Sequence, residues 1–226
     1  MELQEIAILW ICQDISVEGG SMKYYSYVIP RDYGFAPNPY FEYCTLATCK
    51  PRIRKSAQLG DWIAAYGASG TNVHKKLVVL MKVGEILSFD QYWSDTRFIK
   101  KKPVFNRSMS CMYGDNIYHH VGEKWSQELS HHSMADGSIN YVNLNRDTQT
   151  DRVLVATQFY YFGNNAIEIP KEFNLLIGKG RNHKNRYDEK IRNKFIDFIT
   201  ENYEVGIHGV PYSRKSGQFA HYKGEK

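Results

Sequence analysis

The sequence predicts an α+β domain, and three observations support this fold class. Residues 23–29 and 76–83 are rich in the aromatic and β-branched side chains that are typical of strands. Residues from about 187 to 203 carry apolar side chains at helical spacing, on one face of a helix. The chain has 226 residues, of which 42% are hydrophobic, so it is long enough to bury one sizeable core.

The beginning and end of the chain differ in composition from the part between them. Residues 16–21 are rich in glycine and serine and resemble a linker, so we expect residues 1–21 to be a leader or extension that need not be native. A single compact domain is expected over residues 22–209. Residues 210–226 contain many Gly, Lys and Ser residues and are expected to form a flexible tail.

The elements within the domain are predicted in order from local signals. Three prolines and a glycine predict a loop over residues 30–39. Residues 59–66 are expected to enter a strand that pairs with residues 76–83 as an antiparallel hairpin. Ser88, with Gln91 at the capping-box position, predicts a short helix, and residues 152–162 predict one strand.

The composition limits the classes of protein that the chain can represent. The formal net charge of +5 permits attraction to phosphates without demonstrating it. No apolar run approaches the roughly 18 residues needed to cross a bilayer, and no signal peptide is recognisable, so we expect a cytoplasmic protein without a membrane partner. The four cysteines are too few for a disulfide scaffold and are interpreted as free thiols.

Two basic segments are candidates for phosphate binding. Residues 178–184 form a glycine-containing loop without the spacing of a P-loop, and residues 50–55 are predicted to be a basic turn before the next strand. A solvated basic surface is the alternative for both segments. The expected phosphate-binding residues are Arg52, Arg54, Lys179, Arg181, His183 and Lys184.

A polar centre between residues 115 and 133 carries the candidates for chemistry. Histidine titrates near neutral pH, so Asp115, His119 and His131 are the expected acid–base residues if the protein is an enzyme. No HExxH motif or second cysteine pair is present, so no metal and no cofactor are expected, and Cys44 and Cys49 are interpreted as structural thiols. Residues suited to stacking on a base or binding its edge are Tyr25, Asn38, Trp62, Asn116, Tyr118, Ser130 and His132.

Several motifs in a fixed order resemble those of one known family. They are Tyr24-Tyr-Ser-Tyr-Val-Ile-Pro30, Gly34-Phe-Ala-Pro-Asn-Pro39, Tyr43-Cys-Thr-Leu-Ala-Thr-Cys-Lys-Pro51, Gly60-Asp-Trp-Ile63, Gly114-Asp-Asn-Ile-Tyr118, Ser130-His-His-Ser133, Phe159-Tyr-Tyr-Phe-Gly163 and residues 178–184. Together they resemble the nucleotide modification associated domain 2 family of bacteria and phages. The resemblance implies a link with modified DNA bases and carries no assigned reaction. A looser resemblance to PUA, ASCH and EVE domains implies a small mixed or antiparallel β-barrel with flanking helices.

Three functions remain open at this point. The first is recognition of modified nucleotides or bases in DNA, with nucleotide or DNA as the partner. The second is an enzyme that acts on a nucleotide or base by hydrolysis or group transfer, and the third is a protein-interaction module. The sequence leaves the oligomeric state open.

Overall fold

The computed structural model of the chain describes residues 22–178, 185–214, 218–222 and 224. The predicted leader, residues 1–21, and the basic residues Lys179, Arg181, His183 and Lys184 lie outside the described residues. The described part combines helices with several β-sheets, so the α+β class is confirmed.

Strands and helices alternate along the chain without a simple repeat. The strands are β1 (Tyr24–Ile29), β2 (Cys44–Leu46), β3 (Trp62–Gly67), β4 (Leu77–Lys82), β5 (Glu85–Leu87), β6 (Tyr118–Val121), β7 (Lys124–Gln127), β8 (Val153–Ala156), β9 (Phe159–Tyr161) and β10 (Gly206–Ile207). The α-helices are α1 (Pro51–Ser56), α2 (Phe89–Ser94), α3 (Met109–Met112), α4 (Tyr141–Asp147) and α5 (Glu189–Asn202). The 3-10 helices are η1 (Thr96–Lys101), η2 (Gly163–Asn165) and η3 (Lys171–Leu176).

The largest sheet has five strands in the order β1-β3-β4-β9-β10. β1 runs parallel to β3, and β3 pairs with β4 in antiparallel register, as the hairpin prediction requires. The predicted strand over residues 76–83 and the predicted cap of α2 are also confirmed: the Ser88 side chain accepts from the Gln91 amide, and the Gln91 side chain accepts from the Ser88 amide.

The prediction of one strand over residues 152–162 is wrong. The chain bends between β8 and β9, and the two strands belong to different sheets. β8 pairs with β2 and β5 in a three-stranded sheet, while β9 joins the five-stranded sheet. β6 and β7 form a separate hairpin. The described strands therefore form three open sheets, and they do not close into a barrel.

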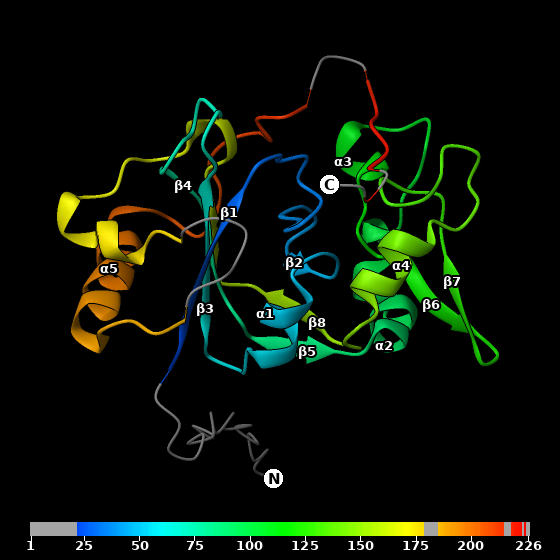
Figure 1. Ribbon diagram of the computed structural model, residues 1–226, viewed down its shortest axis with the longest axis horizontal. Coiled ribbons are helices and arrows are strands. Elements are labelled where there is room, and N and C mark those ends of the chain that lie inside the picture. Colours follow the sequence, from blue (N-terminus) through cyan, green and yellow to red (C-terminus); the bar gives the residue numbers. More distant parts are fainter. Residues whose placement is uncertain (1–21, 179–184, 215–217, 223, 225–226) are drawn as a thin grey trace, which may run out of the picture.

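The sheets and helices pack as layers around three groups of buried apolar side chains (Figure 1). α5 covers one face of the five-stranded sheet through Phe195 and Ile199, on the helical face that the sequence predicts. The opposite face, which includes Tyr25 and Tyr27, packs against the β2-β8-β5 sheet. That small sheet is covered on its far side by α2 and α4. The central small sheet thus connects the two halves of the domain.

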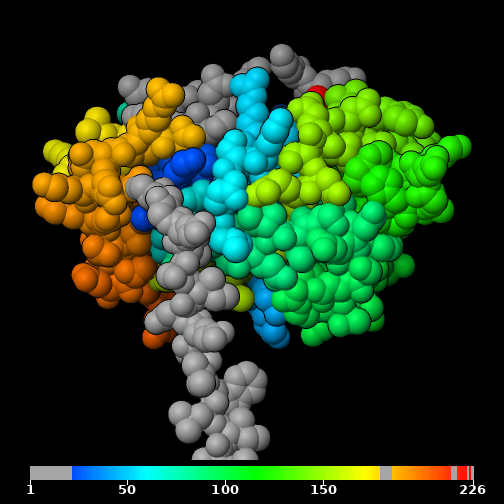
Figure 2. Space-filling model, turned by 90° about the horizontal axis from the view of Figure 1, so that it is seen from below, coloured from blue at the N-terminus to red at the C-terminus, as the bar shows by residue number. Residues whose placement is uncertain are grey.

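The basic segment after β2 is a helix rather than the expected turn. Pro51 occupies the first turn of α1, where its missing N–H group costs no hydrogen bond. Ile53 and Arg54 are buried, whereas Arg52 is exposed. Viewed from below, the cyan residues around α1 lie between the orange α5 and the green segments of the chain (Figure 2).

Candidate active site

Three segments that are distant in the sequence meet beside α1. Cys49 lies between β2 and α1, His132 lies in a turn after β7, and Asp147 is the last residue of α4. The three side chains offer a sulfur, a nitrogen and an oxygen atom that all lie within 4.8 Å of one another. Cys49 is half-buried, while His132 and Asp147 are buried.

The side chains contact one another in the order that nucleophilic catalysis requires. Cys49 Sγ lies 3.8 Å from His132 Nε2, and His132 Nδ1 lies 2.7 Å from Asp147 Oδ2. The histidine therefore faces the thiol with one ring nitrogen while the carboxylate fixes the other. This is the arrangement in which a base activates a nucleophile and an acid orients the base.

The Asp147 carboxylate is held from four directions. Oδ1 accepts from the Cys49 backbone N–H at 2.9 Å and from Arg146 Nε at 3.0 Å. Oδ2 accepts from the Tyr118 hydroxyl at 3.0 Å as well as from His132. Through the bond to the Cys49 amide, the carboxylate also positions the Cys49 backbone directly.

The same contacts bear on whether the cluster would hold a metal ion. Cys, His and Asp are all metal ligands, and their spacing here suits an ion. A carboxylate has about four lone-pair positions, and those of Asp147 are already engaged by protein donors. A metal would leave only the thiolate and His132 Nε2 as ready ligands. The donor set therefore favours the catalytic triad over a metal site.

The charges of the cluster stabilise an ionised thiol. Burial opposes ionisation of Cys49, but the neighbouring His132 outweighs it, and the pKa of Cys49 lies below its ordinary value. Burial opposes protonation of His132, but Asp147 and Cys49 together raise its pKa. Burial also disfavours the Asp147 carboxylate, and His132 and Arg146 nevertheless hold its pKa well below the usual range. Both shifts act in the direction of a thiolate–imidazolium pair supported by a carboxylate.

The backbone around the cluster is fixed by further hydrogen bonds. The His132 carbonyl accepts from Gln127 Nε2 at 3.1 Å and from Asn143 Nδ2 at 2.9 Å. The Arg54 guanidinium is fully buried and donates to the carbonyls of both Cys49 and Asp147. Two of the three triad members are therefore tied together through their main chains as well as through their side chains.

The C-terminal segment passes close to the histidines. The Tyr222 N–H donates to the His131 carbonyl at 2.6 Å, and the Tyr222 ring centroid lies 5.5 Å from that of His132. Arg31 and Arg146 each place a guanidinium near the same tyrosine ring, at 5.6 and 5.5 Å. An aromatic ring with two cations thus borders the triad.

The three predicted acid–base residues occupy different surroundings. Asp115 is buried and accepts from the hydroxyls of Thr45 and Tyr92, and burial raises its pKa to about 6 although Lys101 opposes the shift. His119 stacks on the Trp93 ring at a centroid distance of 3.9 Å. His131 is bonded through Nδ1 to the Ala220 carbonyl, and burial lowers its pKa to about 3. The described contacts do not bring these three residues together.

The predicted base-binding residues divide into two groups. Tyr118, Ser130 and His132 gather at the triad, where Ser130 Oγ accepts from the His132 amide at 3.3 Å. The remaining residues are buried in the interior, and they are Tyr25, Asn38, Trp62 and Asn116. Tyr25 and Trp62 lie in cores on opposite faces of the five-stranded sheet, so they do not line one pocket.

The predicted phosphate-binding residues are also separated. Arg52 is exposed on α1. Arg54 on the same helix is fully buried, and four of its five N–H groups donate to backbone carbonyls, so it does not present its guanidinium to a phosphate at the surface. Gly178 packs closely on β1, where an added Cβ would lie 3.0 Å from the Tyr27 Cα. The basic residues that follow it lie outside the described part of the chain.

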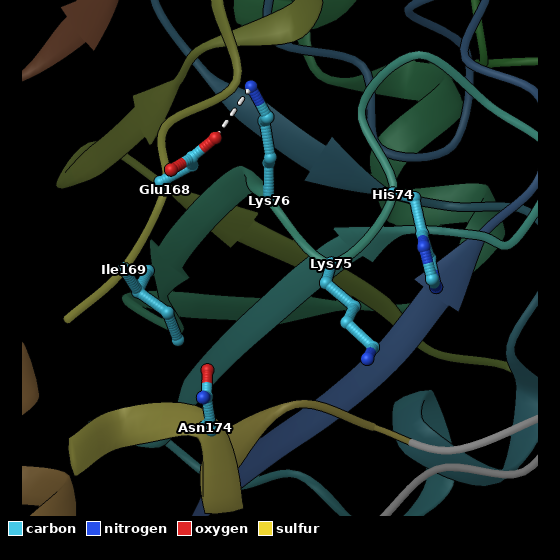
Figure 3. A pocket seen from close by; sticks show the side chains of 6 residues that line it. All are labelled: His74, Lys75, Lys76, Glu168, Ile169 and Asn174. Atoms are coloured by element: carbon cyan, nitrogen blue, oxygen red, sulfur yellow. Dashed lines mark ion pairs between the residues drawn. The ribbon is translucent and has the colours of Figure 1, made fainter. Parts of the chain in front are cut away.

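A surface pocket of about 200 Å³ lies elsewhere, between the β3–β4 connection and η3 (Figure 3). Its lining consists of His74, Lys75, Lys76, Glu168, Ile169 and Asn174. Lys76 and Glu168 form an ion pair across it at 3.2 Å. It is smaller than typical ligand pockets of roughly 300–1,000 Å³, and its lining contains no Phe, Tyr or Trp for a base to stack on. None of the predicted site residues lines it.

The fold and the site define an α+β protein with a Cys–His–Asp triad. The chain belongs to the nucleotide modification associated domain 2 family, whose model matches residues 21–218, and the resemblance seen in the motifs is thereby confirmed. The family's description associates the domain with nucleotide modification. Comparisons with curated proteins and with solved structures found no match. Within the described residues, no helix has the length and apolar character needed to cross a membrane.

Two members of this cluster, Cys49 and Asp147, are not among the site residues that the sequence predicts. Cys49 was interpreted as a structural thiol, and Asp147 was not singled out. Two signals were available in the sequence. Lys50 and Pro51 place Cys49 directly before a helix, and Ser130-His-His-Ser133 places adjacent histidines in an irregular segment, where one of them can face a distant partner.

Proposed function

We propose that the domain is a thiol-dependent enzyme that hydrolyses or transfers a group on a nucleotide or nucleotide base. The observation that carries this proposal is the chain of contacts from Cys49 Sγ through His132 to Asp147. A structural thiol needs neither a histidine facing it nor a buried carboxylate behind that histidine. The family membership supports a nucleotide as the substrate class.

The residues have distinct roles in the proposed reaction. The Cys49 thiolate attacks an electrophilic carbon of the substrate, so that a C–S bond forms and the bond from that carbon to the leaving group breaks. His132 passes the thiol proton to the leaving group. A water molecule or another acceptor then gives its proton to His132 and attacks the same carbon, which releases the thiolate. Asp147 keeps Nε2 of His132 directed at Cys49 and stabilises the imidazolium.

The first test measures the reactivity of the thiol without a substrate. We expect iodoacetamide at pH 7 to alkylate Cys49 much faster than Cys111, which is also half-buried but belongs to no triad. Peptide mass spectrometry reads both sites in one chain, so Cys111 serves as the internal reference. Equal rates at the two cysteines would refute an activated nucleophile.

The second test looks for turnover. Deoxynucleoside monophosphates with and without base modifications, and DNA duplexes with the same bases, are incubated with the protein and analysed by mass spectrometry. We expect product formation with the wild type and with Cys111→Ala, and none with Cys49→Ala. Turnover that survives in Cys49→Ala would show that the thiol is not the nucleophile.

Recognition of a modified base in DNA without turnover is the second candidate. The half-exposed Tyr222 ring, with Arg31 and Arg146 beside it, offers a surface for base stacking next to the triad. Saturable binding of one modified base, with no product and no loss of binding in Cys49→Ala, would favour this candidate over the enzyme.

A further inference from the structure

Lys50, the residue after the nucleophile, has an unusual position. Both Cys49 and Lys50 have left-handed backbone conformations, with φ of 56° and 40°. Such conformations are uncommon for residues other than glycine and concentrate at functional sites, where the surrounding structure maintains them. The turn presents Cys49 and Lys50 at the same point of the fold, between β2 and α1.

The Lys50 ammonium group is partly removed from water without a matching carboxylate. Its Nζ lies 4.5 Å from the centroid of the Tyr27 ring, and the residue is half-buried. Among the described residues, no Asp or Glu forms an ion pair with it. Burial lowers its pKa, and only the Cys49 thiolate acts in the opposite direction. A half-buried cation in such surroundings favours a negatively charged ligand.

Other groups around Cys49 increase the positive charge. The cationic side chains that act on the thiol and its carboxylate are Lys50, Arg54, Arg146 and protonated His132. Asp147 and the thiolate itself act in the opposite direction. The Arg146 side chain is 27% exposed and places its guanidinium between Asp147, His132 and the Tyr222 ring, so part of it lies at the surface where a ligand can reach it.

Two buried hydroxyls beside this cation also have unused hydrogen-bonding capacity. The Lys50 ammonium lies over the Tyr27 ring. Among the residues that the structure describes, neither the Tyr27 hydroxyl nor the hydroxyl of Thr48, the residue before Cys49, has a hydrogen-bond partner. Both residues are at most 1% exposed. A buried polar group without a partner costs about 1–3 kcal/mol, so two of them next to a nucleophile indicate a site built for a polar ligand.

We infer that Lys50, with Arg146, forms an anion subsite beside Cys49, so that the substrate carries a negatively charged group close to the carbon that reacts. The inference rests on the proposed function and narrows it. The substrate class is a nucleotide whose phosphate binds at Lys50, rather than a neutral free base or nucleoside.

Two alkylating reagents of nearly the same size test the subsite without a known substrate. Iodoacetate is an anion and iodoacetamide is neutral, and both report on the same thiolate. We expect the ratio of the iodoacetate rate to the iodoacetamide rate to be at least about tenfold higher at Cys49 than at Cys111, because attraction by Lys50 and Arg146 acts only on the anion. Equal ratios at the two cysteines would overturn the inference.

Variants of two lysines in the same segment locate the effect. Lys50→Gln is expected to lower the ratio at Cys49 toward that of Cys111, with Arg146 retaining part of the preference, while Lys50→Arg keeps the positive charge and the full preference. Lys55→Gln, at an exposed position of α1, is the matched control and is expected to keep the wild-type ratio. A ratio that is unchanged in Lys50→Gln would show that Lys50 does not form the subsite.

Inorganic phosphate provides a second readout. We expect phosphate to protect Cys49 from iodoacetamide saturably in the wild type and in Lys55→Gln, and to protect it at least about fivefold more weakly in Lys50→Gln. Equal protection in Lys50→Gln would count against the subsite. Rapid iodoacetamide alkylation of Cys49 with no preference for anions would still support Cys49 as an activated nucleophile and would refute only the anion subsite. Slow alkylation by both reagents would refute the proposed function itself.

Discussion

Replacement of Arg54 by methionine tests how strongly one buried cation holds the active-site segments together. The guanidinium donates to the carbonyls of Cys49, Asp147, Thr150 and Arg152, and the side chain is fully buried. Methionine fills a similar volume but donates no hydrogen bond. The substitution therefore leaves four carbonyl groups without this donor.

The structure sets the size of the expected effect. A buried group that loses its hydrogen-bond partner costs about 1–3 kcal/mol, and each carbonyl retains a second lone pair, so we take about 1 kcal/mol for each. Arg54→Met should then lower the free energy of unfolding by about 4 kcal/mol, which is a large part of the 5–15 kcal/mol typical of a domain. Arg52→Met, at the exposed position two residues earlier, should change it by less than about 0.5 kcal/mol.

The assay is urea unfolding at pH 7, followed by circular dichroism for the wild type and both variants. We expect a clear fall in the midpoint for Arg54→Met and none for Arg52→Met. If Arg54→Met does not fold, the loss exceeds the stability of the domain and agrees with the reasoning, provided that Arg52→Met folds normally. A loss below about 1 kcal/mol for Arg54→Met would refute it, because it would mean that the carbonyls need no charged donor.

Three further predictions concern titrating groups. His132→Gln should slow alkylation of Cys49 at pH 7 at least tenfold. Two charges 3.8 Å apart interact by up to about 4 kcal/mol near a protein surface, and a third of that energy corresponds to a factor of ten in rate. The rate of alkylation by iodoacetamide tests this prediction, and an unchanged rate would contradict it. Asp147→Asn should destabilise the protein at pH 7 and progressively less toward pH 3, because a carboxylate with a lowered pKa contributes stability that is lost as the pH falls. Urea unfolding midpoints of the wild type and the variant across this pH range test the trend. A difference between the two midpoints that stays constant with pH would argue against it. Lys101→Met should cost about 3–5 kcal/mol at pH 7 and less at pH 5. At pH 7 Asp115, whose pKa is raised to about 6 by burial, is largely ionised, and Lys101, whose pKa is lowered to about 8 by burial, is largely protonated; at pH 5 Asp115 is largely neutral and needs no countercharge. Urea unfolding at both pH values tests the prediction, and equal losses would contradict it.

The elements that the sequence predicts correctly are those with strong local signals. The aromatic and β-branched run before Pro30 forms β1, the capping box of Ser88 and Gln91 starts α2, and the apolar face of residues 191–199 forms the buried side of α5. In each of these, residues a few positions apart determine the structure. Pairing partners and sheet membership follow from distant contacts, so the division of residues 152–162 between two sheets was not visible.

The site was harder to predict than the fold for the same reason. A histidine shows that chemistry is possible, but not which nucleophile or carboxylate it meets. His132 was expected to contact a base, and the acid–base roles were assigned to Asp115, His119 and His131, which are closer together in the sequence. Proximity in the sequence does not determine which side chains meet, because adjacent residues such as His131 and His132 face different partners, the Ala220 carbonyl and the Asp147 carboxylate.

The wide spacing of the triad has a consequence for how the protein folds. Cys49 lies 83 residues from His132 and 98 residues from Asp147, so the site exists only after two long loops have closed. Contacts of this range form slowly, because the chain loses much conformational entropy before they stabilise it. The enhanced reactivity that we propose for Cys49 should therefore appear among the last events of refolding. The rate of Cys49 alkylation, measured by short pulses of reagent at successive times of refolding, would then report when the native structure is complete.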